Sequence, residues 1–141
     1  MPYFETKIFE FEHGEPYSTM CRKRSCYFDE CREYEYSCVS IRIIKHEVVI
    51  AFSYPNVTAE DEVAILRCAG DAIYVVSGII VTAVESCIEF DRSCLITINT
   101  SILSSNEKGK EVFLQGLRRS GLPEEIINAC EVRVITRDYH D

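Results

Sequence analysis

The middle of the chain alternates apolar and polar side chains with a period of two, and this pattern sets the fold class. Residues 39–43 alternate in this way, and after a short turn at Lys45 and His46 the alternation resumes over residues 48–54 until Pro55. A period of two gives a strand one apolar face, and proline stops a strand because it cannot donate a ladder hydrogen bond. We therefore predict two neighbouring strands joined by a tight turn.

A helix is expected directly after these strands. Thr58 is a good N-cap residue, and the acidic residues 60–62 suit the positive first turn of a helix. Apolar side chains then recur at helical spacing, and Gly78 is the predicted C-terminal stop.

A second set of the same signals follows. Residues 80–90 and 94–98 alternate like strands around a turn at 91–93, and Ser104 with Glu107 has the spacing of a capping box for another helix. Gly121 and Leu122 have the pattern of a Schellman ending, Pro123 is expected to open a short helix, and a last strand is predicted over Val132–Thr136. Residues 38–73 and 85–120 thus resemble one strand–strand–helix unit used twice.

Two such units predict a single α+β domain covering residues 1–141. Each unit leaves one apolar sheet face to be covered, so the units should pool their strands. We expect a two-layer sandwich with a mostly antiparallel sheet of about five to six strands and two main helices on one face. Residues 36–137 form this β-β-α repeat core. Residues 1–35 contribute an N-terminal strand, Tyr3–Glu12, a turn signal at residues 13–16, and an irregular segment rich in cysteine and tyrosine.

Charge and hydropathy exclude some partners. The net charge of −8 disfavours nucleic acid and anionic membranes. One basic triplet, residues 22–24, precedes Tyr27 and Phe28, but the acidic residues that follow it neutralise it, so a solvated loop is expected there. The first twelve residues lack a signal-peptide core, and the apolar stretch 72–84 is shorter than a membrane span. We therefore expect a cytoplasmic protein that does not bind a membrane.

Eight cysteines leave three interpretations open. A reducing compartment favours free, mostly buried thiols; the alternatives are a disulfide framework and a metal site. Cys21, Cys26, Cys31 and Cys38 are the candidate metal ligands, but their spacing is wider than that of the paired cysteines in most zinc sites, and the chain contains no C-x-x-C motif.

The three histidines give no catalytic signature. His13, His46 and His140 lie at a turn, between two strands and near the C-terminus, so each is interpreted as a surface residue. No P-loop, G-x-S-x-G motif or glycine-rich dinucleotide loop is present, and no cofactor is expected.

The sheet face opposite the helices is the predicted ligand site. It would combine carboxylates, hydroxyls, an amide and guanidinium groups: Glu85, Glu89, Thr97, Asn99, Arg133 and Arg137. Such a face can be simply solvated, bind a small polar ligand, or be buried in a homo-oligomer. We expect a dimer or trimer formed through this face.

Pro2 suggests an enzymatic alternative. After removal of the initiator methionine its amine would start a strand, and burial lowers the pKa of an amine toward that of a general base. The opening Met-Pro-Tyr-Phe followed by a strand resembles the start of tautomerase-superfamily proteins. The resemblance implies a keto–enol isomerase in which Pro2 is the base, with Arg133 or Arg137 orienting an anionic substrate. It is confined to the start of the chain, because residues 13–35 lack the long amphipathic helix that this family places after its first strand.

The sequence therefore favours a self-associating ligand-binding or regulatory module. A small tautomerase-like enzyme using Pro2 is the first alternative, and a metal-binding module using the four cysteines at positions 21–38 is the second.

Overall fold

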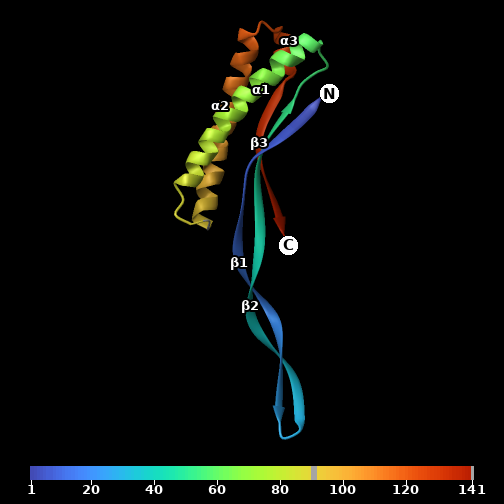
Figure 1. Cartoon of the computed structure of the whole chain (residues 1–141), viewed down its shortest axis with the longest axis vertical. Helices are drawn as coiled ribbons and strands as arrows, with labels where there is room; N and C mark the ends of the chain where they lie inside the picture. Colours follow the sequence, from blue (N-terminus) through green and yellow to red (C-terminus); the bar gives the residue numbers. More distant parts are fainter. Residues whose placement is uncertain (90–91, 141) are drawn as a thin grey trace.

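A computed structural model, which describes residues 1–89 and 92–140, shows a long β-hairpin with a helical hairpin packed beside one end of it (Figure 1). The elements in chain order are β1 (Tyr3–Tyr27), β2 (Glu30–Ser53), α1 (Ala59–Glu85), α2 (Arg92–Arg119), α3 (Glu124–Ala129) and β3 (Glu131–His140). The α+β class predicted from the sequence is confirmed.

The described strands form one antiparallel sheet with the order β1-β2-β3. The central strand, β2, pairs with β1 over its whole length, whereas β3 pairs only with residues 44–53 of β2. Residues 14–43 therefore continue beyond the third strand as a two-stranded ribbon, which projects away from the helices in Figure 1 and which we call the arm. The rest of the described chain is the body.

A β-bulge in β1 keeps its apolar side chains on one face. The register places Phe4 opposite Phe52, but it shifts between Lys7 and Phe9, so Ile8 is an extra residue in the ladder. Without the bulge, Phe9 and Phe11 would point away from the side that carries Phe4. With it, aromatic side chains on both sides of the bulge face the helices.

The helices begin and pack as local sequence dictates. Thr58 caps α1, with its hydroxyl accepting a hydrogen bond from the Asp61 amide at 3.2 Å. Glycines set the distance between α1 and α2: a Cβ atom at Gly109 would lie 2.7 Å from Val76, and one at Gly116 would lie 2.8 Å from Cys68. The two helices therefore approach more closely than larger residues would allow.

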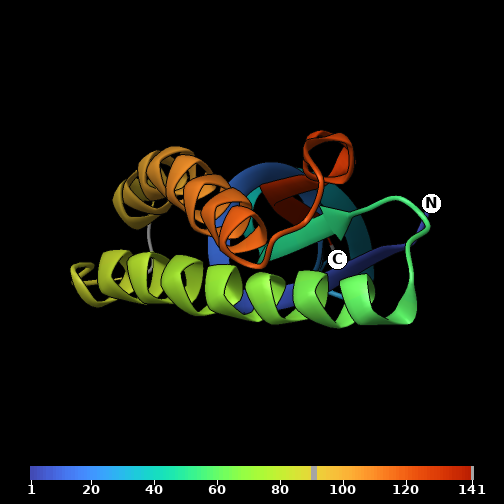
Figure 2. The same cartoon turned by 90° about the horizontal axis from the view of Figure 1, so that it is seen from above.

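The core lies between the helical hairpin and one face of the sheet (Figure 2). Phe52 of β2 meets Phe113 of α2 edge to face, with ring centroids 5.2 Å apart. Both rings are fully buried, as are Val48, Ile50, Ile65, Val76, Ile80, Ile98 and Leu117. Burying a side chain of this size stabilises the fold by about 1.5–3 kcal/mol.

The predicted sheet of five to six strands is wrong, because the described sheet has three. Residues 39–43 and 48–53 belong to one strand, β2, with no turn at Lys45 and His46. Residues 80–85 continue α1 past Gly78, and residues 94–98 belong to α2, so the described residues form neither of the two predicted strand–strand–helix units. Ser104 and Glu107 lie inside α2 and cap nothing. The buried residues of this stretch recur every three or four positions, as one face of a helix requires: Cys94, Ile98, Ile102 and Ser105. Helical packing therefore overrides the strand preference of the β-branched residues. Phe90 and Asp91, part of the predicted strand and turn, lie outside the described residues.

The irregular segment predicted before residue 36 is also wrong. Residues 13–16 continue the strand, and residues 17–35 form the outer part of the arm. Pro16 fits there because, in the arm, β1 pairs on one side only. Three local predictions are confirmed: strands at Tyr3–Glu12 and Val132–Thr136, and the Schellman ending, in which Leu122 donates to the Leu117 carbonyl at 3.3 Å after Gly121 at φ +79°.

Candidate functional site

The base of the arm is where the sheet narrows from three strands to two. His13, Ile44 and His140 form the last rung in which all three strands are paired. Gly14, the next residue of β1, already belongs to the arm. Side chains at this position therefore determine how the arm is joined to the body.

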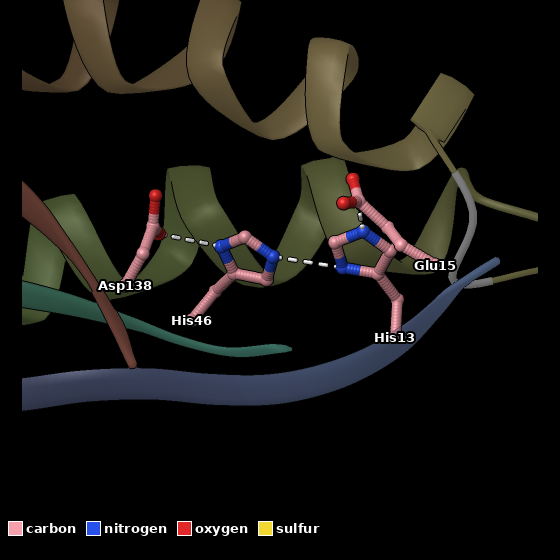
Figure 3. Close-up of polar contacts among 4 residues, drawn as sticks. All are labelled: His13, Glu15, His46 and Asp138. Atoms are coloured by element: carbon pink, nitrogen blue, oxygen red, sulfur yellow. Dashed lines mark hydrogen bonds and ion pairs between the residues drawn. The ribbon is translucent and has the colours of Figure 1, made fainter. Parts of the chain in front are cut away.

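A chain of four polar side chains crosses this base (Figure 3). Asp138 of β3 contacts Nδ1 of His46 with its Oδ1 atom at 2.6 Å. Nε2 of His46 lies 2.8 Å from Nδ1 of His13, and Nε2 of His13 lies 3.3 Å from Oε1 of Glu15. The chain joins β3, β2 and β1, and we call it the histidine–carboxylate chain.

The two imidazoles are buried and the two carboxylates reach solvent. His46 and His13 expose only 3% and 9% of their surface, and the ring of Phe11 stacks on His46 with centroids 4.9 Å apart. The side chains of Asp138 and Glu15 are 53% and 42% exposed. The chain is therefore a buried polar connection with both ends open to water, through which protons can enter or leave.

The interpretation of His13 and His46 as surface residues is wrong. Both occupy inward-facing positions of an alternating pattern: His46 lies between Ile44 and Val48 on β2, and His13 follows Phe11 on β1. A histidine at an apolar position of a strand was the signal available in the sequence. The side-chain environment of His140 lies outside the described residues.

The donor and acceptor roles within the chain depend on the tautomers of the two imidazoles. An ionised carboxylate only accepts, so a ring nitrogen that is bonded to one must donate to it. The other two ring nitrogens, Nε2 of His46 and Nδ1 of His13, face each other.

The nearby stretches of the two helices carry no charged side chain. The stretches 72–84 of α1 and 93–106 of α2 contain no Asp, Glu, Lys, Arg or His, and the two helices run past the imidazoles in Figure 3. Lys45 lies on the opposite sheet face, where its ammonium group contacts Glu10 at 3.2 Å. This contact raises the pKa of Lys45, and hydrogen bonds from Lys7 and Lys45 lower the pKa of Glu10. The carboxylates of Asp138 and Glu15 are the described acidic groups that contact the imidazole pair.

The arm is held together by two disulfides and ends in exposed aromatic rings. Cys26 pairs with Cys31 directly across the ribbon, and Cys21 pairs diagonally with Cys38. At the tip, Phe28 and Asp29 have φ values of +53° and +55°, a backbone region that favours glycine. Phe28 is 83% exposed and stacks edge to face on Tyr27, which is 76% exposed. The arm therefore presents an aromatic pair on a stiffened support.

The cysteines are mostly paired, so the expectation of free thiols is wrong for six of the eight. A third disulfide joins Cys87 to Cys94 at the connection between α1 and α2. Cys68 and Cys130 are free, and burial raises the pKa of both thiols. The four candidate metal ligands form the two arm disulfides, Cys21–Cys38 and Cys26–Cys31, so their thiolates cannot bind a metal ion in this state. Among the described residues, no group of three or more His, Cys, Asp or Glu side chains is placed to hold a metal ion.

The predicted ligand residues do not share one sheet face. Glu85 and Glu89 lie at the end of α1 and after it, Thr97 and Asn99 lie on α2, and Arg133 and Arg137 lie on β3. Their separation follows directly from the helical structure of residues 80–85 and 92–98.

Arg137 is occupied by an ion pair on the helix-free face. Its guanidinium donates two hydrogen bonds of 2.6 Å to Glu5, which also accepts one from the Tyr3 hydroxyl at 2.8 Å. These bonds lower the pKa of Glu5 and raise the pKa of Arg137 and of Tyr3. Since β2 lies between the two partners, the pair reaches across Val49 and Ala51 and shields them.

Pro2 and the basic triplet have structural partners. The Pro2 carbonyl accepts a hydrogen bond from the Tyr54 amide at 3.2 Å, which ties the start of the chain to the end of β2. In the arm, Arg22 lies 3.4 Å from Glu35 on the opposite strand. Arg24 lies opposite Glu33 in the register.

No protein-family model, curated protein or solved structure matches this chain. One described helix, α1, is long and apolar enough by composition to cross a membrane, with a mean hydropathy of 1.7 in its most apolar window of 18 residues. Because 33% of that window is buried inside the fold, the helix also serves the core.

Proposed function

We propose that the chain is a binding module. In this proposal the arm presents Tyr27 and Phe28 to an apolar pocket of another protein, and the histidine–carboxylate chain sets how firmly the arm is held to the body. The observation that carries the proposal is the position of that chain: it links all three strands within two residues of the last fully paired rung, where the arm begins.

The position of the histidine–carboxylate chain gives it a structural role. Its hydrogen bonds connect β3 to β2 and β2 to β1 beside the rung where the arm leaves the body. Loss of these bonds would therefore loosen the base of the arm.

The tip supports a binding role for the arm. A non-glycine residue with positive φ costs roughly 1–2 kcal/mol, and such strain is typically retained at functional positions. Two disulfides hold the ribbon in one shape, so little conformational entropy is lost when a partner binds. The three cysteine pairs also support a non-reducing compartment as the working environment of the protein.

Catalysis is less well supported. The two imidazoles, the best acid–base groups in the described chain, are buried among strand side chains, and a general base must reach its substrate. For the tautomerase-like alternative, Arg137 would first have to leave Glu5. A keto–enol assay of wild type and Pro2→Ala tests that alternative directly.

The test compares arm and body in solution. Residual dipolar couplings report the orientation and order of the arm relative to the body. His46→Gln removes the imidazole that contacts both Asp138 and His13, so we expect lower order of the arm in this variant than in the wild type.

Glu12→Gln provides the matched control, because Glu12 is an exposed carboxylate next to His13 on the same strand. The arm of this variant should be as ordered as that of the wild type. An arm that stays equally ordered in His46→Gln would refute the proposed role of the histidine–carboxylate chain.

A further inference from the structure

One edge of β2 is open along the arm. β1 pairs with one side of β2 throughout, but the described pairing of β3 with the other side ends at Ile44. Among the described residues, none pairs with residues 36–43 on that second side, and the ribbon continues past the end of β3 in Figure 1. An open strand edge presents unpaired backbone N–H and C=O groups to which another strand can bind.

Two hydrogen bonds of the body show which residues of β2 face this side. The amide of Tyr54, directly after β2, donates to the Pro2 carbonyl on the β1 side. The amide of Val134, opposite Ile50, donates to the side chain of Asn106 and therefore points away from β2. Successive residues of a central antiparallel strand bond alternately to its two neighbours. Even-numbered residues of β2 thus bond to β1, and odd-numbered residues face the β3 side.

Pro16 gives the same result within the arm. It lies opposite Ile41 and has no N–H to donate, so these two residues occupy a rung without mutual hydrogen bonds. The backbone groups of Ile41, and with them those of Val39, therefore point to the open side. Pro16 also removes a donor from the outer edge of β1, which is a common protection of an edge strand, whereas residues 36–43 contain no proline.

Side chains also leave this edge of β2 unblocked. Arg42 is the one charged residue in the stretch 36–43, and its guanidinium group lies over the Tyr17 ring of β1, 4.9 Å from the centroid, which directs it across the ribbon. Val39 and Ile41 are 71% and 69% exposed. By contrast, four of the six residues 30–35 are charged, and charge protects an edge. The available edge is therefore about 27 Å long, at about 3.4 Å per residue.

The chemistry of the edge selects an extended segment with alternating apolar side chains. The N–H and C=O groups of Val39 and Ile41 recur every second residue, which matches the backbone of an extended chain. Their apolar side chains favour apolar residues at alternate positions of the segment. Such a segment would continue the line of β3 along β2. Residues 14–43 carry five basic and five acidic side chains, so the arm itself has no net charge to repel it.

A second copy fits this edge poorly. In an antiparallel pair of β2 strands, the tip of each ribbon has to stay clear of the β3 strand of the other copy. The longest register that does so places Glu33 opposite Val39, and the next places the two Glu35 side chains opposite each other. A parallel pair would bring together the two bodies, each of which carries the net charge of −8.

We propose that residues 36–43 of β2 bind an extended segment of another protein by strand addition beyond the end of β3. Backbone hydrogen bonds to Val39 and Ile41 hold the segment, and contacts with their side chains select its apolar residues. The site uses neither Tyr27 nor Phe28, so it goes beyond the function proposed above and does not depend on it.

Amide hydrogen exchange in the presence of a model strand tests this proposal. The probe is a capped peptide of about seven residues that alternates valine and threonine, added at about 1 mM to the oxidised protein. Exchange of the Val39 and Ile41 amides should slow at least about tenfold when the probe is present. Exchange of the Met20 amide should not change, because Met20 lies opposite Ser37 and its amide faces the outer edge of β1.

Proline substitutions on the two edges form a matched pair. Ile41→Pro removes an N–H from the open edge without removing a bond to β1, and it should weaken probe binding at least about tenfold. Met20→Pro removes an N–H from the outer edge of β1 in the same kind of rung and should bind the probe like the wild type. Val39→Lys, a change at an exposed position, should weaken binding to a similar extent, which covers the case in which proline disrupts the ribbon.

Three results would overturn the proposal. The first is a wild type in which the Val39 and Ile41 amides exchange equally fast with and without the probe. The second is normal binding in Val39→Lys, or weak binding in Met20→Pro while the ribbon stays intact. The third is protection of these amides that rises with protein concentration in the absence of the probe, which would favour a second copy as the occupant.

Discussion

At the scale of single residues, the informative positions are those that break a local preference. His13 and His46 are polar at positions where the pattern of the sheet requires apolar side chains, and Phe28 is a bulky residue with positive φ. Each departure has a cost, in desolvation for the imidazoles and in backbone strain for Phe28. Hydrogen bonds of the histidine–carboxylate chain offset the desolvation of the imidazoles. No hydrogen bond or ion pair of the described structure offsets the backbone strain at Phe28. This contrast is why we attribute binding to the tip.

The strain at Phe28 leads to the first prediction. Phe28→Gly removes the penalty for positive φ and should stabilise the turn by about 1 kcal/mol. Hydrogen exchange of the Glu30 amide, which follows the turn, should slow roughly fivefold. Phe28→Leu keeps a side chain in the same conformation and serves as the control. Equal exchange rates in the glycine and leucine variants would contradict the assignment of strain.

The ion pair of Glu5 with Arg137 leads to a prediction about acid stability. Hydrogen bonds from Arg137 lower the pKa of Glu5 in the folded state, so the unfolded state takes up a proton first as the pH falls. The stabilisation is present above the ordinary carboxyl pKa and is lost as the pH falls through the lower, folded value. Glu5→Gln should therefore be less stable than wild type near neutral pH, and the difference should shrink toward about pH 3.

Urea unfolding across this pH range measures the effect. Glu107→Gln, which removes an exposed carboxylate from α2, provides the reference for a general change in charge. A difference between wild type and Glu5→Gln that stays constant from neutral to acid pH would rule out the ionic origin.

At the scale of elements, the sequence correctly predicted the N-cap of α1 and the ending of α2, but it did not predict where α1 ends, where α2 begins, or which element a buried run forms. Thr58 and Gly121 act through local hydrogen bonds that depend only on near neighbours, and both predictions are confirmed. Whether residues 80–85 and 94–98 form a helix or a strand depends on what covers them. Ile80 and Ile98 fit an alternating pattern as well as a helical one, and only packing of α1 on α2 decides between the two.

The arm was missed for a related reason. Its outer residues are stabilised by cross-strand pairs and disulfides, so no apolar face repeats over residues 17–35. Arg22 finds Glu35 and Cys21 finds Cys38 only after the hairpin has formed. The candidate site could not be predicted from the sequence for the same reason. Asp138 contacts His46 only once β3 pairs with β2.

Alanine substitutions at Gly109 and Gly70 should change the free energy of unfolding in opposite directions, because only Gly109 lies in the contact between the helices. Gly109→Ala should destabilise the protein by about 1 kcal/mol, because overpacking against Val76 costs roughly 1–3 kcal/mol and the gain in helix propensity is only about 1 kcal/mol. Val76 is fully buried and, being β-branched, has one favoured rotamer in a helix, so it cannot move aside. Gly70→Ala, where a Cβ meets nothing within 4 Å, should instead stabilise by up to about 1 kcal/mol.

Chemical denaturation of both variants measures the two free energies of unfolding. If Gly109→Ala were as stabilising as Gly70→Ala, the close approach of α1 and α2 at Val76 would be disproved.

At the scale of the whole molecule, the fold divides into a body with a core and an arm without one. The body is stabilised by buried side chains from both helices and the sheet, whereas the outer arm is almost entirely exposed. A two-stranded ribbon on its own is at best marginally stable in water. The shape of the molecule, and with it the proposed binding role, therefore depends on the oxidation state of four cysteines.

This dependence gives the last prediction. Serine at positions 21, 26, 31 and 38 removes both arm disulfides, the larger of which spans 17 residues and is worth roughly 3 kcal/mol to the ribbon. Amides of residues 17–40 should then exchange at rates close to those of an unfolded chain, while amides of β2 beside β3 stay protected by the core. Cys68→Ser, at a free buried thiol, leaves the arm disulfides in place and should not release the arm. If the amides of the ribbon stayed protected from exchange without the disulfides, strand pairing alone would hold the ribbon together. The arm would then be equally stiff in a reducing compartment. Loss of protection confined to the arm would mean that oxidation converts a flexible loop into the rigid support on which Tyr27 and Phe28 are presented.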